Sequence, residues 1–217
     1  MLPVFKNMKI YYAYTDEFDD SFYKNALIVL PEEKASDIAK IKNEKPNKET
    51  LLAWTLLRYA MKEDGKAIFD VDFSKNGKPY LKNCPLFFNL THSEGLVCCA
   101  VCQSEVGIDA EMPKPCRKNV IKRVLCENEI NSMTDEENDF IKLWTIKESF
   151  LKHSGKGISA GLSNLDFSSV FKLEEFDAYG LHFKTAVIDK HKFCVCSKEK
   201  KYEFIRIFAD TLSRHLT

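Results

Sequence analysis

The sequence lacks an excess of charge of either sign, because its 217 residues include 32 Lys and Arg against 32 Asp and Glu. A global positive field, which marks many nucleic-acid-binding proteins, is therefore not indicated, although local basic patches remain possible. The chain has no apolar run near the ~20 residues of a membrane-spanning helix, and its first six residues lack the features of a secretory signal. We therefore expect a cytoplasmic protein that binds neither nucleic acid nor membrane.

Eight cysteines are present, and without a secretory signal we expect their thiols to stay reduced. Cys99 and Cys102 form a C-x-x-C pair within residues 96–102, an apolar stretch that is typical of a buried strand. Residues three apart on a strand point to opposite faces, so the two thiols could not bind one ion. We interpret these cysteines as small buried hydrophobic residues rather than as a zinc or redox site.

Apolar periodicity divides the first half of the chain into helices followed by strands. The predicted elements are a first strand at residues 8–14, helices at 20–30, 31–41 and 49–61, and strands at 67–73, 86–90 and 96–102. Residues 43–48 are polar and include Pro46, so we expect a loop there.

The second half repeats this order after a break near residues 103–106. A predicted strand begins at Gly107 and ends before Pro113. Three predicted helices follow: one from about Asn119, one at 127–132, and one that begins at a capping box at Thr134 and ends at Gly155 and Gly157. The remaining predicted elements are strands at 165–167, 181–187, 192–197 and 202–208. With 45% hydrophobic residues, a chain of this length can form one large domain or two small lobes.

The strand from Gly107 carries two carboxylates. Because side chains alternate along a strand, Asp109 and Glu111 share one face, and Ile108 and Ala110 point the other way, into a core. Like charges on one face repel each other, and a bound cation would relieve that repulsion. The alternative is the solvated face of an edge strand.

Residues 144–152 are predicted to be helical, and positions four apart then form a column of Trp144, Glu148 and Lys152. Lys147 lies about 100° away from this column, so we expect it to face solvent or a phosphate at the rim. If helix and strand pack together, three carboxylates and one ammonium converge. Three oxygen ligands with open positions suit Mg²⁺, which usually keeps waters and takes substrate phosphates. The alternative is an ordinary surface ion pair.

These segments resemble the signature of the Sfp-type 4'-phosphopantetheinyl transferases, which carry Gly-Ile-Asp-x-Glu and Trp-Thr-x-Lys-Glu-Ser-x-x-Lys. Residues 76–80 and 88–93 are similar to that family's Gly-Lys-Pro loop and Phe-Asn-x-Ser-His-Ser segment, in the same order and at similar spacing. The resemblance implies an α+β fold of two similar α/β lobes, related by pseudo-twofold symmetry, with a ligand cleft between them. It implies an N-terminal lobe at 1–103 and a C-terminal lobe at 104–217 that carries the metal site. We expect a monomer, because two lobes in one chain can complete the cleft.

The activity that this resemblance implies is transfer of 4'-phosphopantetheine from coenzyme A to a serine of an apo acyl or peptidyl carrier protein, with release of 3',5'-ADP. Mg²⁺ would bind Asp109, Glu111 and Glu148 and hold the pyrophosphate. Lys152 and His92 would offset the charge that develops on the phosphate oxygens.

A carboxylate must also remove the proton of the carrier serine, directly or through a water. Both Glu148 and Glu129 are candidates for this base, and Glu127 is close enough in sequence to be confused with Glu129.

The resemblance also implies contacts to coenzyme A: residues 77–79 at its adenine end, a basic cluster and a hydroxyl at its 3'-phosphate, and others along its phosphates. These residues are Gly77, Lys78, Pro79, Lys48, Thr50, Thr91, His92 and Lys152. Thr91 stands where the family more often has Ser and keeps the hydroxyl, whereas Glu49 stands where a basic residue is common. The alternatives are a plain hairpin turn at 77–79 and a solvated basic face around Lys48.

A basic segment at residues 113–125 could dock an acidic carrier protein by charge complementarity, or could be a solvated face. Its basic residues are Lys114, Arg117, Lys118, Lys122 and Arg123.

Two other functions remain open: a Mg²⁺-dependent pyrophosphohydrolase of coenzyme A-like nucleotides, and a non-catalytic module that binds carrier protein or coenzyme A. They differ from the transferase in that no group from coenzyme A reaches a protein serine.

Overall fold

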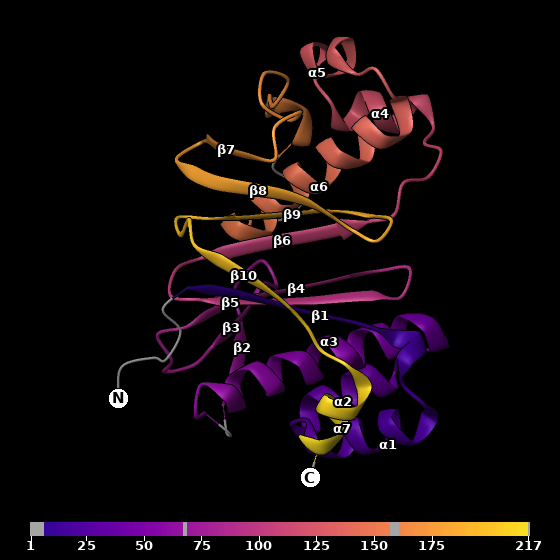
Figure 1. Ribbon diagram of the computed structural model, residues 1–217, viewed down its shortest axis with the longest axis vertical. Coiled ribbons are helices and arrows are strands. Elements are labelled where there is room, and N and C mark those ends of the chain that lie inside the picture. The colour runs from indigo at the N-terminus through magenta and orange to yellow at the C-terminus, as the bar shows by residue number, and fades with distance from the viewer. Residues whose placement is uncertain (1–6, 67–68, 157–160, 217) are drawn as a thin grey trace.

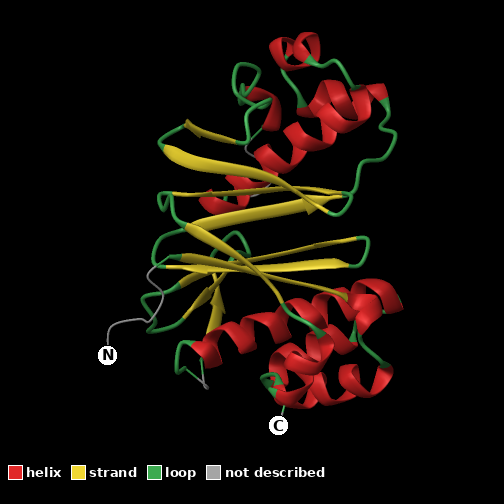
Figure 2. Ribbon diagram, viewed as in Figure 1, coloured by secondary structure: helices red, strands yellow, loops and turns green. Residues whose placement is uncertain are grey.

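Helices lie at the two ends of the molecule, and two β-sheets face each other between them (Figure 1). The computed structural model describes residues 7–66, 69–156 and 161–216. Figure 2 shows the resulting layers, which run from helices through two sheets to helices. No helix within these ranges is both long and apolar enough to cross a membrane.

The first sheet has the strand order β10-β1-β5-β4, and helices cover its outer face. Its strands are β1 Met8–Tyr14, β4 Phe87–Ser93, β5 Leu96–Cys102 and β10 Tyr202–Arg206. The helices of this lobe are α1 Asp20–Val29, α2 Glu32–Ala39, α3 Glu44–Glu63 and α7 Ala209–Arg214, with the 3-10 helix η1 Thr15–Glu17 and a small hairpin of β2 Val71–Phe73 and β3 Pro79–Leu81. Leu52, Leu56 and Ala60 recur at helical spacing in α3 and are fully buried in the core beneath the sheet.

The second sheet has the strand order β6-β9-β8-β7, and one long helix, α6, packs on it. Its strands are β6 Val106–Glu111, β7 Glu175–Ala178, β8 Leu181–Ile188 and β9 His191–Ser197. The helices of this lobe are α4 Lys118–Val124, α5 Glu127–Ser132, α6 Glu136–Ser154 and the 3-10 helix η3 Leu162–Asn164. Leu143 and Ile146 of α6 share a core with Phe183 of β8.

The two lobes repeat one topology, which confirms the expected α+β class. In each lobe a first strand is followed by helices and, further along the chain, by an antiparallel pair (β4 and β5, or β8 and β9), and the later strand of this pair lies beside the first strand. The strand order β1-β5-β4 therefore corresponds to β6-β9-β8.

The C-terminal segment crosses back to the first lobe. β10 pairs in parallel with β1, with Tyr202 opposite Met8, and α7 packs on α3. The expected division between residues 103 and 104 falls between β5 and β6. The C-terminal segment with β10 and α7, however, packs on the first lobe, so not all of 104–217 belongs to the second lobe. The crossing covers the open edge of β1, which would otherwise expose unpaired backbone groups.

The two sheets meet through a shared apolar layer. Ile10 and Cys98 of the first sheet share this layer with Ile108 of the second. Cys99 lies in the core beneath α3, whereas Cys102 lies between the sheets, so the two thiols point to opposite faces as expected. Burial raises the pKa of Cys102 to about 12, as befits a buried apolar side chain.

Several boundaries differ from the predicted ones. The predicted loop at 43–48 is wrong, because α3 begins at Glu44 and includes Pro46 in its first turn, where a missing N–H costs nothing. The predicted strand at 165–167 is also wrong, because this segment is irregular and the Phe167 N–H donates to Glu129 instead of to a strand. The sequence analysis missed β3, β7 and α7. Residues 67, 68 and 157–160, which carry the start of one predicted strand and the second glycine of the predicted stop, lie outside the described residues.

Candidate active site

A glycine sets the approach of α6 to β6. A Cβ atom on Gly107 would lie 1.9 Å from the carbonyl oxygen of Ser149 and 2.3 Å from the backbone nitrogen of His153. The helix therefore rests on the strand backbone to backbone, which only glycine allows. α6 then ends at Gly155, whose φ of 64° is the left-handed conformation expected of a glycine stop.

This close packing brings the predicted carboxylates into one hollow between the lobes. Asp109 and Glu111 of β6 line it together with Glu148 and Lys152 of α6, and with residues of β4. Asp109 and Glu148 are only 4% and 8% exposed, and the hollow has a volume of ≈ 280 Å³. The strand and helix patterns thus correctly predicted which acidic side chains meet.

Two of these carboxylates carry buried oxygen atoms without a hydrogen-bond partner in the described part of the chain: Oδ2 of Asp109 and Oε1 of Glu148. Burial, and next the charge of Asp109, raises the pKa of Glu148. Burial also raises the pKa of Glu111, although a hydrogen bond from Ser93 opposes it. Desolvated carboxylates that repel each other and keep free oxygens are a donor set that fits a hard cation.

The ammonium of Lys152 already balances part of this charge. Its Nζ lies 2.7 Å from Oδ1 of Asp109 and donates to Oγ1 of Thr91 at 3.2 Å. Because Lys152 uses Oδ1, it leaves the second oxygen of Asp109 open.

Among the described residues, the oxygens of Asp109, Glu111 and Glu148 do not all come within 4.8 Å of one another, whereas one other acidic set does. That set is Cys126, Glu129 and Asp166. We give it no metal role, because the Lys147 ammonium lies 2.5 Å from Glu129 and already supplies the positive charge.

Polar side chains of β4 join the two lobes along the hollow. Asn89, Thr91 and Ser93 alternate along the strand and share its face toward β6. The side chain of Asn89 accepts from the Ile108 N–H at 2.8 Å, and Oγ of Ser93 donates to Glu111 at 2.7 Å. The sequence analysis missed Asn89 and Ser93, although polar residues at every second position of an apolar strand were a visible signal.

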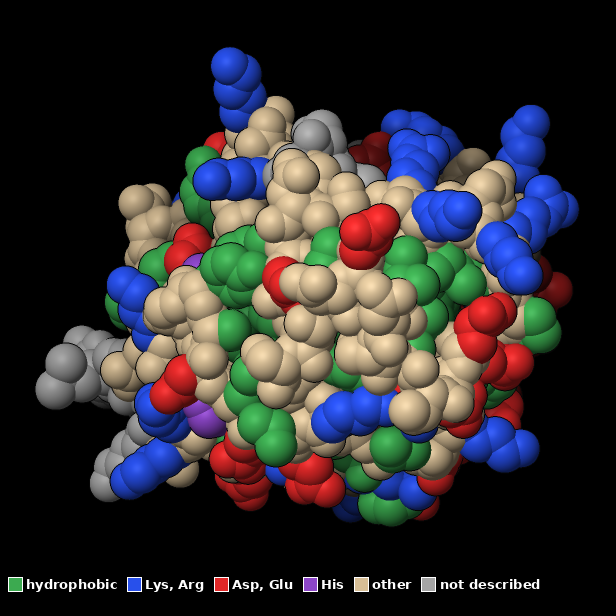
Figure 3. Space-filling model, turned by 90° about the horizontal axis from the view of Figure 1, so that it is seen from above, with side chains coloured by type: hydrophobic (Ala, Val, Ile, Leu, Met, Phe, Trp, Pro, Cys, Tyr) green, Lys and Arg blue, Asp and Glu red, His purple; other side chains and the backbone are tan. Residues whose placement is uncertain are grey.

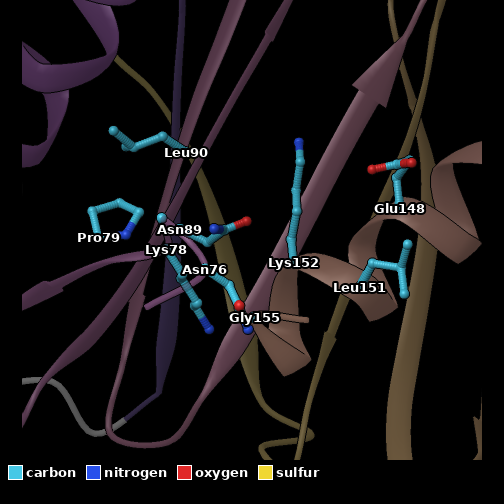
Figure 4. A pocket seen from close by; sticks show the side chains of 10 residues that line it. Asn76, Lys78, Pro79, Asn89, Leu90, Glu148, Leu151, Lys152 and Gly155 are labelled. Carbon is cyan, nitrogen blue, oxygen red and sulfur yellow. The ribbon is translucent and has the colours of Figure 1, made fainter. Parts of the chain in front are cut away.

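The turn at 76–79 lines a second cavity, of ≈ 330 Å³, that reaches the same carboxylates. Figure 4 shows Lys152 extending between this turn and Glu148. Gly77, Lys78 and Pro79 all line this cavity. The ammonium of Lys78, however, is tied to the second lobe, 2.5 Å from the Glu105 carboxylate and 2.9 Å from the carbonyl oxygen of His153 at the end of α6.

Three other predicted contacts have different surroundings. His92 lines the hollow of the carboxylates, and its Nδ1 lies 3.1 Å from Oε2 of Glu49. Lys48 forms ion pairs with Asp20 and Glu44 at the surface of the first lobe. Thr50 is half-buried in α3, and neither Lys48 nor Thr50 lines the two cavities.

Glu129 lies apart from the hollow. It is fully buried, and its oxygens accept from the Lys147 ammonium at 2.5 Å and from the Phe167 N–H at 3.0 Å. The expectation that Lys147 faces solvent or a phosphate at the rim is wrong, because its ammonium is fully buried and also donates to the carbonyl oxygens of Val124 and Leu162 at 2.9 Å. The segments around α4, α5 and η3 cover this side of α6, which helical periodicity alone does not reveal.

The basic segment predicted to dock a carrier protein is exposed. Lys118, Lys122 and Arg123 of α4 are all exposed, as are Lys114 and Arg117 just before it. Figure 3, which views the molecule from the side of α4 and α5, shows Lys and Arg side chains around the rim of this face, most densely in one corner.

The two similar α+β lobes meet at a cleft in which acidic and basic side chains gather, and a cleft of this kind is where an active site is expected. The family model of the 4'-phosphopantetheinyl transferase superfamily matches residues 105–203. The 4'-phosphopantetheinyl transferase Sfp of Bacillus subtilis (strain 168) is 30% identical over 206 residues, 88% of this chain and 92% of the relative.

Two further relatives agree. The 4'-phosphopantetheinyl transferase psf-1 of Bacillus pumilus is 31% identical over 169 residues, 70% of this chain and 72% of the relative. The 4'-phosphopantetheinyl transferase HetI of Nostoc sp. is 36% identical over 109 residues, 45% of each protein. The chain belongs to the 4'-phosphopantetheinyl transferase superfamily, which confirms the resemblance seen in its sequence and makes it a transferase.

Proposed function

We propose that this chain transfers the 4'-phosphopantetheine group from coenzyme A to the hydroxyl of a serine in an apo acyl or peptidyl carrier protein, and releases 3',5'-ADP. Membership of the superfamily supplies the reaction class. The observation that carries the assignment of the site is the convergence of Asp109, Glu111, Glu148 and Lys152 beside the cavity that the 76–79 turn lines.

We propose that Asp109, Glu111 and Glu148 hold Mg²⁺. Their free buried oxygens and the raised pKa of Glu148 support this set. Bound there, Mg²⁺ would neutralise the pyrophosphate and stabilise charge on its oxygens. Positioning and charge neutralisation are what phosphoryl transfer mainly requires of a protein.

Lys152 and His92, which line the same hollow, would bind the phosphate oxygens of coenzyme A. The Lys152 side chain is 30% exposed, so its ammonium can reach a ligand while it stays near Asp109. Thr91 holds that ammonium from β4 at 3.2 Å. Fixed donors of this kind stabilise charge in the transition state without reorganisation.

The serine oxygen would attack the phosphorus that bears the pantetheine group, and the bond from that phosphorus to the bridging oxygen of the leaving 3',5'-ADP would break. We propose Glu148 as the acceptor of the serine proton, directly or through a water, because its carboxylate lines the hollow in which the phosphates would bind. Glu129 is the weaker candidate, since both of its oxygens are engaged in a fully buried ion pair with Lys147 and a backbone N–H.

The turn at 77–79, with Thr50 and Lys48, remains our proposed contact set for the adenine and 3'-phosphate ends. Lys78 and Lys48 would have to release their present partners to reach coenzyme A with their ammonium groups. The exposed basic segment around α4 would dock the acidic carrier by charge complementarity. A monomer and a cytoplasmic location stay predictions from the sequence.

The test is the intact mass of several apo carrier proteins after incubation with the chain, coenzyme A and Mg²⁺. We expect a gain of one phosphopantetheine on a carrier and none on the same carrier with its acceptor serine changed to alanine. Asp109→Asn should abolish the gain, whereas Asp210→Asn, the same change at an exposed site in α7, should not. Free phosphopantetheine without carrier labelling would support the hydrolase instead, and no turnover at all would support a binding module.

A further inference from the structure

A buried carboxylate, Glu49, joins α3 to the end of β4. Glu49 is only 5% exposed, although it lies near the start of a helix whose other acidic residues face outward. Its Oε2 lies 3.1 Å from Nδ1 of His92, and its Oε1 accepts from the Gly95 N–H at 2.7 Å. Both carboxylate oxygens therefore have a defined partner, and one partner is a ring that lines the hollow.

The contact defines which nitrogen of His92 faces the ligand site. A carboxylate only accepts hydrogen bonds, so Nδ1 must carry the proton and donate to Glu49. This leaves Nε2 for other partners, and no hydrogen bond to it occurs within 7–66, 69–156 and 161–216. The His92 side chain is 35% exposed and lines the hollow with Asp109 and Lys152, so Nε2 is open to a bound ligand.

A purely structural role for Glu49, in which it only holds the turn after β4, does not explain why its Oε2 contacts the His92 ring. The turn at Glu94 and Gly95 has two other ties: the Thr15 N–H donates to the carbonyl oxygen of Gly95 at 2.9 Å, and Lys45 pairs with Glu94. Glu49 adds a third tie through Oε1. Its second carboxylate oxygen, Oε2, contacts the imidazole of His92 on β4 and fixes the ring.

We propose that Glu49 is a positioning residue: it accepts a hydrogen bond from Nδ1–H of His92, orients the ring, and so aims Nε2 at a phosphate oxygen of coenzyme A, to which Nε2 donates when the ring carries both of its protons. The inference deepens the proposed function and rests on it for the identity of the ligand. Partners that fix a ring nitrogen in this way change ligand affinity by 10–100-fold at histidine metal sites. We expect loss of Glu49 to weaken coenzyme A binding by about tenfold.

The first test reads the ring directly and needs no activity. Long-range ¹H–¹⁵N spectra of the whole chain, with the His92 signals assigned by His92→Ala, should show a proton held on Nδ1. Glu49→Leu should shift or exchange-broaden that signal. Glu94→Gln, which loosens the same turn without touching His92, should leave it unchanged. A His92 ring that is the same in wild type and Glu49→Leu would overturn the inference.

The second test is a double-mutant cycle on coenzyme A binding, followed by calorimetry and by the KM of transfer. Glu49→Leu and His92→Ala should each raise Kd and KM by about tenfold, and the double variant should be no worse than His92→Ala. Additive losses would contradict the inference, because they would show that Glu49 acts without His92. If the wild-type chain binds coenzyme A but labels no carrier protein, the proposed transferase function is wrong. The spectra of the His92 ring would still test whether Glu49 positions it, because they do not depend on activity.

Discussion

Gly107 is the residue on which the geometry of the candidate site depends most. In Gly107→Ala the new Cβ would lie 1.9 Å from the Ser149 oxygen and 2.9 Å from Cα of His153. Both are backbone atoms of α6, so no side chain can turn aside. To restore an ordinary contact, the helix would have to recede from β6 by about 1.5 Å.

The expected cost follows from that displacement. Overpacking costs about 1–3 kcal/mol of folding stability. Because the added methyl group meets backbone atoms of α6, which cannot move independently of the helix, we expect a loss of about 3 kcal/mol for Gly107→Ala. For a chain of 217 residues that corresponds to a loss of roughly 6–12 °C in the unfolding temperature. Because Glu148 and Lys152 move with α6, and a 1 Å misplacement can cost 10²-fold in rate, carrier labelling should fall about 100-fold in folded protein.

The assay combines thermal unfolding with the initial rate of carrier labelling, measured well below the unfolding transition. Gly180→Ala is the matched control, because Gly180 has a φ of 74° with nothing within 4 Å. It should cost roughly 1–2 kcal/mol of backbone strain and leave the labelling rate unchanged. Wild-type stability and wild-type rate in Gly107→Ala would refute the close packing of α6 on β6.

Three other changes test separate parts of the structure. Burial lowers the pKa of His153 in the folded protein below its ordinary 6.5. The contribution of His153 to the free energy of unfolding should therefore be fully present above pH 6.5 and be lost as the pH falls through the pKa of the folded state. His153→Asn should flatten this pH dependence in urea titrations. Lys147→Met leaves Glu129 charged, buried and unpaired, and should cost about 3–5 kcal/mol in denaturant unfolding, most of which Lys147→Met with Glu129→Leu should recover. Asn89→Ala leaves the Ile108 N–H without its partner and should cost about 1–3 kcal/mol; a wild-type midpoint would show that water replaces the amide.

The sequence predicted the parts of the fold that depend on local pattern. β1 at 8–14 and β5 at 96–102 were placed to the residue because short apolar runs define them, and α5 at 127–132 also lies at its predicted bounds. The meeting of Asp109 and Glu111 with Glu148 was also predictable, since two periodicities, of strand and helix, place these side chains on facing surfaces.

The parts that failed depend on contacts between distant segments. No local pattern reveals that β10 returns to pair with β1, nearly the whole chain away. Lys147 looked solvated because helical spacing does not show what covers the far side of α6. Glu49 looked like a departure at a phosphate-binding position, and its partners on β4 and in the following turn are visible only after the first lobe has folded.

The most direct test of the account is the Mg²⁺ dependence of carrier mass, measured with wild-type chain and with Glu148→Gln. The account predicts that wild type adds one phosphopantetheine to an apo carrier only when Mg²⁺ and coenzyme A are both present. It predicts that Glu148→Gln, although folded, adds none at the same Mg²⁺ concentration. Labelling by wild type in the presence of a chelator, or full labelling by Glu148→Gln, would contradict the assignment of the carboxylate cluster as the catalytic metal site.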